Sequence, residues 1–389
     1  MNKASDTLLR VAVLTNMIPR YRTKVFTALA ETSQIKLKFF LSLPVERSDD
    51  IAIKGLELQH TQTVNMPWVT INRHSGSIQK QLLPLPFALP IDLMRFHPDV
   101  IISGDMGSRS LMAYVMSKVL RVPLIIWSEE TLVHDSTVGR LQKKARHFLF
   151  SRAEKFLAWG KPATEFLVKR GVPQERVIYC AQAVDNNEWT ERAKAIAVQK
   201  HALLSSNPGT VGRVGLFVGQ LIPCKGLDRL LLAFAALPEK TKQENSLVLV
   251  GEGSEREALK AQAHELGITN FFTVGLKSPA ELVSYYKQAD FLILPSLMDV
   301  WGLVVNEAMA CDLPVLSSVW AGATQELVEE TGIGEAFDPL NQNEFTNALL
   351  RWFETPPTIQ QGAARQAVSK LNFDVSIQAI RNSLLTYKE

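Results

Sequence analysis

The amino-acid sequence predicts two α/β domains, each built on a parallel sheet with helices on its faces. Short apolar runs alternate with longer amphipathic segments, the pattern of buried strands covered by helices. A polar stretch rich in Ser, Asn, Pro and Gly, from about Thr190 to Gly212, interrupts this alternation, which then restarts. The 389 residues exceed one ordinary core and allow two or three domains of roughly 150 residues each.

In the first half, the apolar runs have the length of buried strands, and the segments between them have helical periodicity. The expected strands are Val11–Thr15, Ile35–Leu41, Val100–Ser103, Leu124–Trp127, Lys155–Trp159 and Val177–Tyr179. The expected helices are Thr23–Glu31, Ser108–Leu120, Gly139–Arg152 and Pro162–Arg170, the last with Gly171 as its C-cap.

The same alternation after the polar stretch predicts a second sheet of similar design. The expected strands are Val214–Val218, Leu247–Val250, Phe271–Val274, Phe291–Leu294 and Pro314–Ser317. The expected helices are Leu227–Ala236, Glu255–Leu266, Pro279–Gln288 and Leu303–Ala310, with further helices near the C-terminus. Two such halves joined by a linker are expected to bind ligands in a cleft, outside the carboxyl ends of their strands.

Composition excludes several classes of protein. Hydrophobic residues make up 46% and charged residues 21%, as in a folded soluble protein, and the net charge of +3 is too small to indicate nucleic acid. Cys180, Cys224 and Cys311 lie far apart, so we expect reduced thiols and no metal site. The apolar run Val11–Leu14 is short, so we expect it to be a buried strand and expect no export signal. Leu82–Ile91, broken by prolines, is too short to span a bilayer and is expected to be a loop, packed on the core or touching lipid or a hydrophobic acceptor.

Two strand ends in the second half carry glycines and a lysine that suit a phosphate ligand. In GQLIPCKGLDRL, Gly219 allows a sharp turn and Lys225 precedes a helix N-terminus, where anions bind. In GEGSE, Gly251 and Gly253 remove side chains where a ligand could approach the backbone. A glycine after a strand is more often only a turn, so neither segment alone establishes a site.

A third strand end is more specific. The segment PSLMDVWGLVVNEAMACDLPV places Asp299 in a loop, Gly302 before a helix and Glu307 about one turn inside it. Two carboxylates that bracket a helix N-terminus can hold hydroxyl groups while the helix amides face a diphosphate. The alternative is that Asp299 caps the helix and Glu307 is solvated, but Glu307 interrupts an otherwise apolar helix, where an unpartnered carboxylate is costly.

With these residues in place, the chain resembles the retaining glycosyltransferases of family 4, which have the GT-B fold. GQLIPCKGLDRLLLAF is similar to that family's G-R-x(n)-K-G-x-D segment, VGEGSEREAL to its V-G-x-G segment, and ADFLILPSLMDVWGLVVNEAMACDLPV to its E-x7-E segment. VIISGDMGSRS, LIIWSEET and the AVD at 183–185 also fit family positions. The resemblance implies two Rossmann-like domains facing across a cleft.

That fold implies an acceptor-side domain over 1–195 and a nucleotide-sugar domain over 210–370, with a C-terminal helix over 371–389 packing back on the first domain. The resemblance also implies roles for single residues. Glu307 would bind the ribose, Asp299 the donor hexose and Lys225 the leaving diphosphate. The remaining expected donor contacts are Gly219, Gln220, Gly251, Gly253, Gly275, Leu276, Lys277, Trp301, Gly302, Leu303 and Val304.

Three positions depart from the family pattern. Gln220 stands where the family usually has arginine, which removes a charge-assisted contact of about 1–2 kcal/mol. Asp299 replaces glutamate and reaches one methylene less far. Asp312 replaces a glycine, which we expect to be only a structural change.

The first half offers candidates for catalysis and for acceptor binding. Glu129 and Asp105 follow strands at the expected cleft and are catalytic candidates in addition to Asp299 and Lys225. The alternative for each is a solvated loop carboxylate. Acceptor contacts are expected from Tyr21, Arg22, Glu130 and His134, although a surface histidine is the more common reading of His134.

One predicted helix of the first half is basic and free of acidic residues. It carries Arg140, Lys143, Lys144 and His147 on one side and apolar residues on another. The default interpretation is a solvated helix that packs on its own core. The alternative is a peripheral contact with anionic lipid headgroups.

Together these patterns predict a cytoplasmic enzyme, or one at the inner face of the plasma membrane. It would transfer a hexose from a UDP- or GDP-linked donor to a sugar, glycolipid or small-molecule acceptor in polysaccharide or glycolipid synthesis, with retention. We expect no cofactor and no metal. The alternatives are a sugar-nucleotide-binding protein without turnover and an epimerase or phosphorylase of the same fold.

Overall fold

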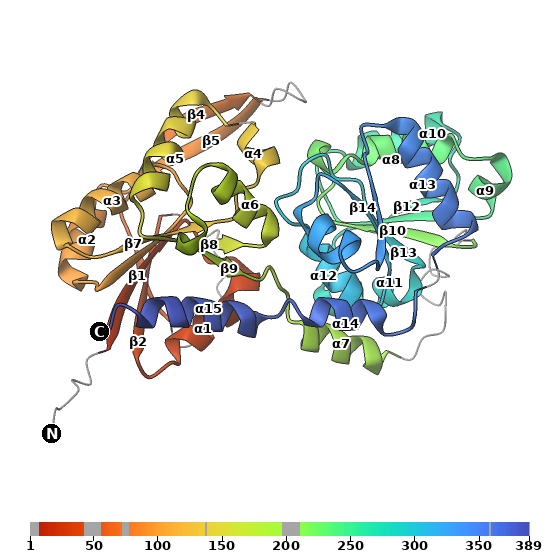
Figure 1. Cartoon of the computed structure of the whole chain (residues 1–389). Helices are drawn as coiled ribbons and strands as arrows, with labels where there is room; N and C mark the ends of the chain where they lie inside the picture. Colours follow the sequence, from red (N-terminus) through yellow and green to blue (C-terminus); the bar gives the residue numbers. More distant parts are fainter. Residues whose placement is uncertain are drawn as a thin grey trace. The chain divides into compact units, whose positions relative to one another are not determined.

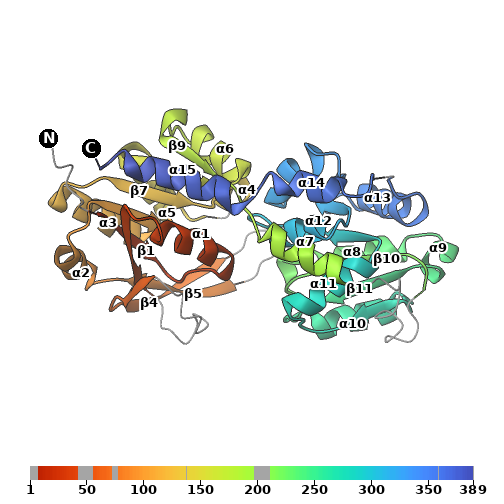
Figure 2. The ribbon, with the colours of Figure 1, turned by 90° about the horizontal axis from the view of Figure 1, so that it is seen from below.

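A computed structural model describes residues 8–42, 56–71, 78–136, 138–196, 211–357 and 359–388. The chain forms two compact units, one of Met1–Ala181 with Phe373–Glu389 and one of Gln182–Asn372. Figures 1 and 2 show a sheet with helices on its faces in each unit.

The first unit has a parallel sheet in the order β3-β2-β1-β6-β7-β8-β9. Its strands are β1 (Leu9–Thr15), β2 (Ile35–Leu41), β3 (Glu57–His60), β6 (Val100–Gly104), β7 (Leu124–Ser128), β8 (Lys155–Trp159) and β9 (Val177–Cys180). Its helices are α1 (Arg20–Ala30), α2 (Leu89–Phe96), α3 (Ser108–Leu120), α4 (Leu132–Ser136), α5 (Arg140–Arg152), α6 (Lys161–Lys169), η2 (Gln174–Arg176) and α15 (Phe373–Leu385).

Alternate residues of each strand belong to two separate cores, because successive side chains of a strand point to opposite faces of the sheet. On β1, Val11 and Val13 pack with residues of α1 and α15. Ala12 and Leu14 pack on the other face with residues of α2, α3, α5 and α6. Both faces are therefore covered, which is why these strands are almost continuously apolar.

Most of the stretch expected to be a loop, Leu82–Ile91, has regular structure, so the prediction was wrong except for the turn at residues 86–88. Residues 82–85 belong to β5 (Ile78–Leu85), which pairs antiparallel with β4 (Val64–Ile71), and α2 begins at Leu89. Proline lacks a backbone N–H, but in a two-stranded ribbon some backbone N–H groups point outward and need no partner strand. Proline is also tolerated in the first turn of a helix.

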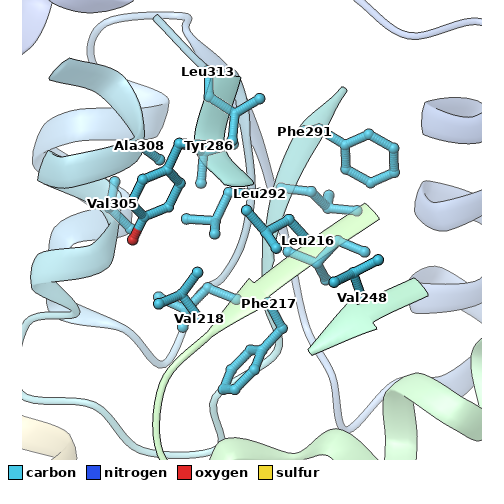
Figure 3. Packing of buried hydrophobic residues seen from close by; sticks show 14 of the residues in the cluster. Leu216, Phe217, Val218, Val248, Tyr286, Phe291, Leu292, Val305, Ala308 and Leu313 are labelled. Atoms are coloured by element: carbon cyan, nitrogen blue, oxygen red, sulfur yellow. The ribbon is translucent and has the colours of Figure 1, made fainter. Parts of the chain in front are cut away.

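The second unit has a parallel sheet in the order β12-β11-β10-β13-β14-β15. Its strands are β10 (Val214–Val218), β11 (Ser246–Val250), β12 (Phe271–Thr273), β13 (Phe291–Leu294), β14 (Val315–Ser318) and β15 (Gly334–Phe337). Its helices are α7 (Asn186–Ala195), η3 (Pro223–Lys225), α8 (Leu227–Ala235), α9 (Glu239–Gln243), α10 (Arg256–Glu265), α11 (Pro279–Gln288), α12 (Leu303–Ala310), η4 (Thr324–Glu329), α13 (Gln342–Glu354) and α14 (Ala363–Ser369). Figure 3 shows part of its core, with Leu216, Val248 and Leu292 from neighbouring strands in contact.

The boundary between the units differs from the predicted one. The chain changes unit between Ala181 and Gln182, so α7 belongs to the second unit although the first domain was expected to run to residue 195. Trp189 of α7 packs edge-on against Tyr286, and Asn186 donates hydrogen bonds to the carbonyls of Val368 and Leu371. These buried contacts fix α7, and residues 197–210 of the expected linker lie outside the described part. At the other end, α15 packs against α1 and β9.

Candidate functional site

Three loops meet at the carboxyl edge of the second sheet, one after each of β10, β11 and β12. The Gly219 amide donates to the carbonyl of Val250 at 3.0 Å, and the Gly251 amide donates to Gly275 at 2.9 Å. The Leu221 amide donates to the carbonyl of Glu252 at 2.9 Å. These hydrogen bonds join the loop after β10, the expected phosphate loop, to the loop after β11. They also join the loop after β11 to the loop after β12, the expected base-binding loop.

The close approach of these loops explains their glycines. A Cβ on Gly251 would lie 1.8 Å from the carbonyl oxygen of Gly219, and a Cβ on Gly253 would lie 2.2 Å from that of Leu221. The packing of loop on loop alone therefore requires glycine at both positions. Their expected contact with a donor remains a prediction.

Replacing Gly251 with alanine should lower the free energy of unfolding by about 3 kcal/mol or more, because the side chain meets backbone and the φ of +144° is unfavourable. Gly267→Ala is the matched control. Its φ is +66°, but nothing lies within 4 Å of the added Cβ, so only about 1–2 kcal/mol is expected. Denaturant unfolding of both variants measures the difference, and equal losses would contradict the packing argument.

Lys225 and Asp299 form an ion pair at this edge. The Lys225 Nζ lies 2.5 Å from Asp299 Oδ2, and the two side chains keep 18% and 17% of their exposure. Gly226, at a φ of +63°, allows the Lys225 turn to approach the β13 loop, because a Cβ there would lie 2.3 Å from the carbonyl oxygen of Pro295. The Leu297 amide also donates to the carbonyl of Cys224 at 2.8 Å. The fold thus brings together two residues that are 74 positions apart.

A second loop, which sequence reasoning missed, holds Asp299 from the other side. The Asp299 amide donates to the Trp320 carbonyl, and the Gly322 amide donates back to the Asp299 carbonyl, each at 3.1 Å. A Cβ on Gly322 would lie 2.2 Å from the carbonyl oxygen of Val300. The only sequence signal for this contact is a glycine soon after the strand that ends at Ser318.

The helix that carries Glu307 begins without a side-chain cap. Gly302 is the N-cap of α12 with a φ of +94°, and no side chain caps the helix. Asp299 therefore pairs with Lys225 and does not cap α12, contrary to the alternative considered from the sequence. Trp301 is buried, with its indole Nε1 donating to Asn306 Oδ1 at 2.7 Å, which fixes the start of the helix. The amides of Leu303 and Val304 lie in this uncapped turn, which suits an anion.

Glu307 has a buried partner, Tyr286 of α11, which the sequence did not point to. The Tyr286 hydroxyl donates to Glu307 Oε2 at 2.7 Å. Figure 3 shows the Tyr286 ring beside Val305 and Ala308 of α12. Burial raises the pKa of Glu307 to about 7, and the hydrogen bond from Tyr286 acts in the opposite direction. Glu307 thus changes charge near neutral pH.

Replacing Tyr286 with phenylalanine should raise the pKa of Glu307 further, because the hydrogen bond that favours the carboxylate is lost. If the charged form binds the donor, the acid limb of donor binding should move to higher pH and the donor KM near pH 7 should rise about fivefold. Tyr285→Phe is the matched control, since the hydroxyl that donates to Glu307 belongs to Tyr286 and not to Tyr285. If the acid limb of donor binding stayed at the same pH in Tyr286→Phe, Tyr286 would have no role in holding Glu307 in its charged form.

The other expected donor residues lie at or near this edge. Gln220 and Leu276 are exposed, and Lys277 lies 3.8 Å from Glu281.

Asp312, which stands where the family usually has glycine, has a φ of +65° and accepts a hydrogen bond from the Gly362 amide at 2.7 Å. This residue therefore joins α14 to the turn after α12.

In the first unit, Asp105 follows β6 with a φ of +77° and accepts the Gly107 amide at 2.8 Å. It pairs with Arg109, which is buried and also donates to Asn16 Oδ1 at 2.7 Å and to the Gly104 carbonyl. Arg109 also donates to Ser42 Oγ at 3.1 Å. The sequence did not point to Arg109, because its partners follow three separate strands, β1, β2 and β6. The Asp105 carboxylate keeps 43% of its exposure.

Glu129, the second catalytic candidate of this unit, is held by Arg22 and Trp127. Arg22 lies 3.1 Å from Glu129 Oε1, and the Trp127 indole donates to the same oxygen at 3.0 Å. Arg22 is 1% exposed and lies over the Trp159 ring, so it is too deeply buried to contact an acceptor directly. Burial and the Glu129 charge raise the pKa of Tyr21 to about 12, which keeps its hydroxyl protonated.

Glu130 and His134 belong to an ion network centred on buried Arg146. Arg146 donates to Glu130 Oε1 at 2.5 Å and to Asp135 Oδ1 at 2.7 Å, and the second oxygen of Glu130 lies 2.5 Å from His134 Nδ1. The hydrogen bond with Glu130 raises the pKa of His134. Arg170 also pairs with Asp135. Both expected acceptor residues therefore already have partners within the unit.

The described residues contain neither a cluster suited to a metal ion nor a helix suited to span a membrane. No group of three or more His, Cys, Asp or Glu among them is placed to hold a metal ion. No helix in the described part is long and apolar enough to cross a membrane.

Residues 207–368 match the family model described as glycosyl transferases group 1. The D-inositol 3-phosphate glycosyltransferase of Thermobispora bispora is 30% identical over 219 residues, which are 53% of this chain and 49% of the relative. The Corynebacterium efficiens protein of that name is 32% identical over 191 residues, 47% of this chain and 43% of the relative. The chain thus spans about half or less of the length of these relatives.

Solved structures are similar over nearly the whole chain. HepE of Anabaena, solved in complex with UDP, superposes with a TM-score of 0.74 at 17% identity and covers 97% of this chain and 100% of its own. The lipopolysaccharide outer core galactosyltransferase WaaB, in its apo form, has a TM-score of 0.73 at 17% identity, covering 97% and 99%. These likenesses confirm the GT-B fold, with two parallel-sheet α/β units.

Proposed function

We propose that this chain is a retaining glycosyltransferase that uses a nucleoside-diphosphate sugar, because residues 207–368 match the family model of glycosyl transferases group 1. One observation carries the proposal. The Lys225–Asp299 ion pair lies at the carboxyl edge where α12 begins, with no side-chain cap on that helix and with Glu307 farther along it. A cation, the first-turn amides of a helix without a side-chain cap and two carboxylates on neighbouring elements match the parts of such a donor.

In the proposed complex each group meets one part of the donor. The Glu307 carboxylate accepts hydrogen bonds from the ribose hydroxyls, and Asp299 accepts them from the sugar. The first-turn amides of α12 and Lys225 face the diphosphate. The backbone of Gly275–Lys277 meets the base. HepE was solved with UDP and with UDP-glucose, which supports a UDP-linked donor, and a GDP-linked donor is the alternative.

In the proposed reaction the site stabilises the negative charge that forms on the departing phosphate. The bond between the anomeric carbon and the phosphate oxygen breaks, and the acceptor oxygen forms the new bond on the same face of the sugar. The acceptor proton goes to the departing phosphate, so the nucleoside diphosphate leaves as product. Negative charge grows on that phosphate, and Lys225 with the α12 amides stabilises it electrostatically. Asp299, which holds Lys225 in the free protein, exchanges that partner for sugar hydroxyls when the donor binds.

We assign the acceptor to the first unit, where Asp105 and Glu129 lie at or after the carboxyl ends of β6 and β7. Each is held by a buried arginine, Arg109 and Arg22, so each carboxylate is fixed in orientation. Tyr21, Glu130 and His134 are the proposed neighbours. The lipopolysaccharide outer core galactosyltransferase among the similar structures supports a role in polysaccharide or glycolipid synthesis. We place that role in the cytoplasm or at the inner face of the plasma membrane as part of the proposal.

Donor screening tests the proposal. Binding of UDP- and GDP-hexoses is measured as a rise in melting temperature, since a bound ligand stabilises the folded state. Release of nucleoside diphosphate is then measured with sugar and lipid-linked acceptors. Release with one donor and acceptor supports a transferase. Binding without release in every combination would favour a binding protein without turnover, consistent with the exposed neutral Gln220. A changed donor sugar without release would indicate an epimerase.

A further inference from the structure

Two helices on one outer face of the first unit carry basic and no acidic side chains, and the nearest exposed carboxylate, Glu154 just after α5, lies beside Lys118 and Arg152. The two helices are α3 and α5, which pack on the same side of the sheet. Neither helix contains Asp or Glu. The exposed cationic side chains of these helices are Lys118, Arg140, Lys143, Lys144 and Arg152, with His147 among them. These side chains, together with exposed Val115, Val119 and Leu141 of the same helices, are called the α3–α5 face.

The same face exposes aliphatic side chains that a solvated helix pair would normally cover. Leu141 is 70% exposed, Val119 is 62% exposed and Val115 is 53% exposed. The neighbouring helix α2, which contacts α3, adds exposed Ile91 and Met94. Isolated exposed apolar residues are ordinary, but several on adjoining helices indicate a contact surface.

The inward side of α5 already accounts for the stability of this helix. Arg146, Leu149 and Phe150 are buried, and Arg146 forms the ion network with Glu130 and Asp135. The Phe148 ring packs edge-on against Tyr114 of α3 at 5.1 Å, which fixes one helix against the other. The outward Lys143 and Lys144 form no ion pair with the described residues, so packing gives no reason for their charges.

From this arrangement we infer that the α3–α5 face binds a membrane surface that contains anionic lipids. Cations attract the negative headgroups, and aliphatic side chains enter the boundary between headgroups and acyl chains. The absence of carboxylates on both helices matches that charge. Nucleic acid is a poorer match, because its bases stack on aromatic side chains, whereas the exposed apolar residues of α3 and α5 (Val115, Val119 and Leu141) are aliphatic. The inference does not depend on the transfer reaction, since the face lies on helices of the first unit alone.

Vesicle co-sedimentation of the full chain tests this. We expect binding to phosphatidylcholine vesicles that contain about a third phosphatidylglycerol, weak binding to phosphatidylcholine alone, and a loss of binding as salt is raised. Lys143→Glu with Lys144→Glu should weaken binding to the anionic vesicles at least about tenfold. Leu141→Ser should weaken it severalfold with little change in salt dependence.

Lys169→Glu with Lys194→Glu is the matched control, because it makes the same change in net charge at exposed positions on α6 and α7. This control should bind the anionic vesicles nearly as the wild type does. Equal losses in both double variants, equal binding to neutral and anionic vesicles, or no binding to either would overturn the inference. Retention on single-stranded RNA in preference to vesicles would also overturn it. Circular dichroism of each variant separates loss of binding from loss of folding.

Discussion

Lys225→Ala should lower kcat for sugar transfer by about 10²–10³-fold while the protein remains folded. In the free protein Lys225 balances the charge of Asp299, and in the proposed complex it balances the charge that grows on the departing phosphate. The second charge is larger in the transition state than in the bound donor, so the loss should fall mainly on kcat. Steady-state release of nucleoside diphosphate, measured against donor concentration, separates kcat from KM.

The control for this change is Lys260→Ala, which removes an exposed lysine of α10 that pairs with Glu257 at 2.9 Å. Its kinetics should match the wild type. Lys225→Ala also leaves Asp299 without its cation, so the melting temperatures of Lys225→Ala and Asp299→Asn should be compared. A rate that falls only as far as the folded fraction falls would contradict a role in catalysis. A tenfold rise in KM with an unchanged kcat would assign Lys225 to ground-state binding.

The sequence predicted most strands of both sheets because strands buried on two faces are almost continuously apolar. The predicted bounds of β2, β8, β10 and β13 agree with the structure. Helices α3 and α12 are also placed as predicted. The β4–β5 hairpin was missed because its prolines indicate a loop, and whether proline is tolerated depends on strand pairing that composition does not reveal.

At the site, the backbone signals were visible in the sequence, and the side-chain partners were not. Glycines after strands and a lysine before a helix follow local rules of chain geometry. Tyr286, Arg109 and Arg146 have ordinary positions in helices, and only the tertiary fold brings each of them to a carboxylate. Long-range partners of this kind leave no spacing pattern.

Glu307→Gln is expected to make the protein more stable and its donor binding weaker, with both effects depending on pH. The pKa of Glu307 is about 7 in the folded chain, above its ordinary value of 4.5, because burial disfavours the carboxylate. Below pH 4.5 the group is neutral whether the chain is folded or unfolded, so it has no effect there. Stability is lost as pH rises from 4.5 to about 7, because over this range the unfolded chain has released the proton and the folded chain still binds it, and the loss is complete above about 7.

Glutamine avoids that loss, so Glu307→Gln should raise the free energy of unfolding by about 2–3 kcal/mol at pH 8 and change it little at pH 4.5. Ribose hydroxyls hydrogen-bond more strongly to a carboxylate, so the donor KM at pH 8 should rise about ten- to a hundredfold. The wild-type KM should fall as pH rises through the pKa of Glu307, and this limb should be absent in the variant. Denaturant unfolding and donor kinetics at both pH values measure the two effects. If Glu307→Gln lost stability at pH 8, the carboxylate would be stabilising there, and the assigned pKa would be wrong.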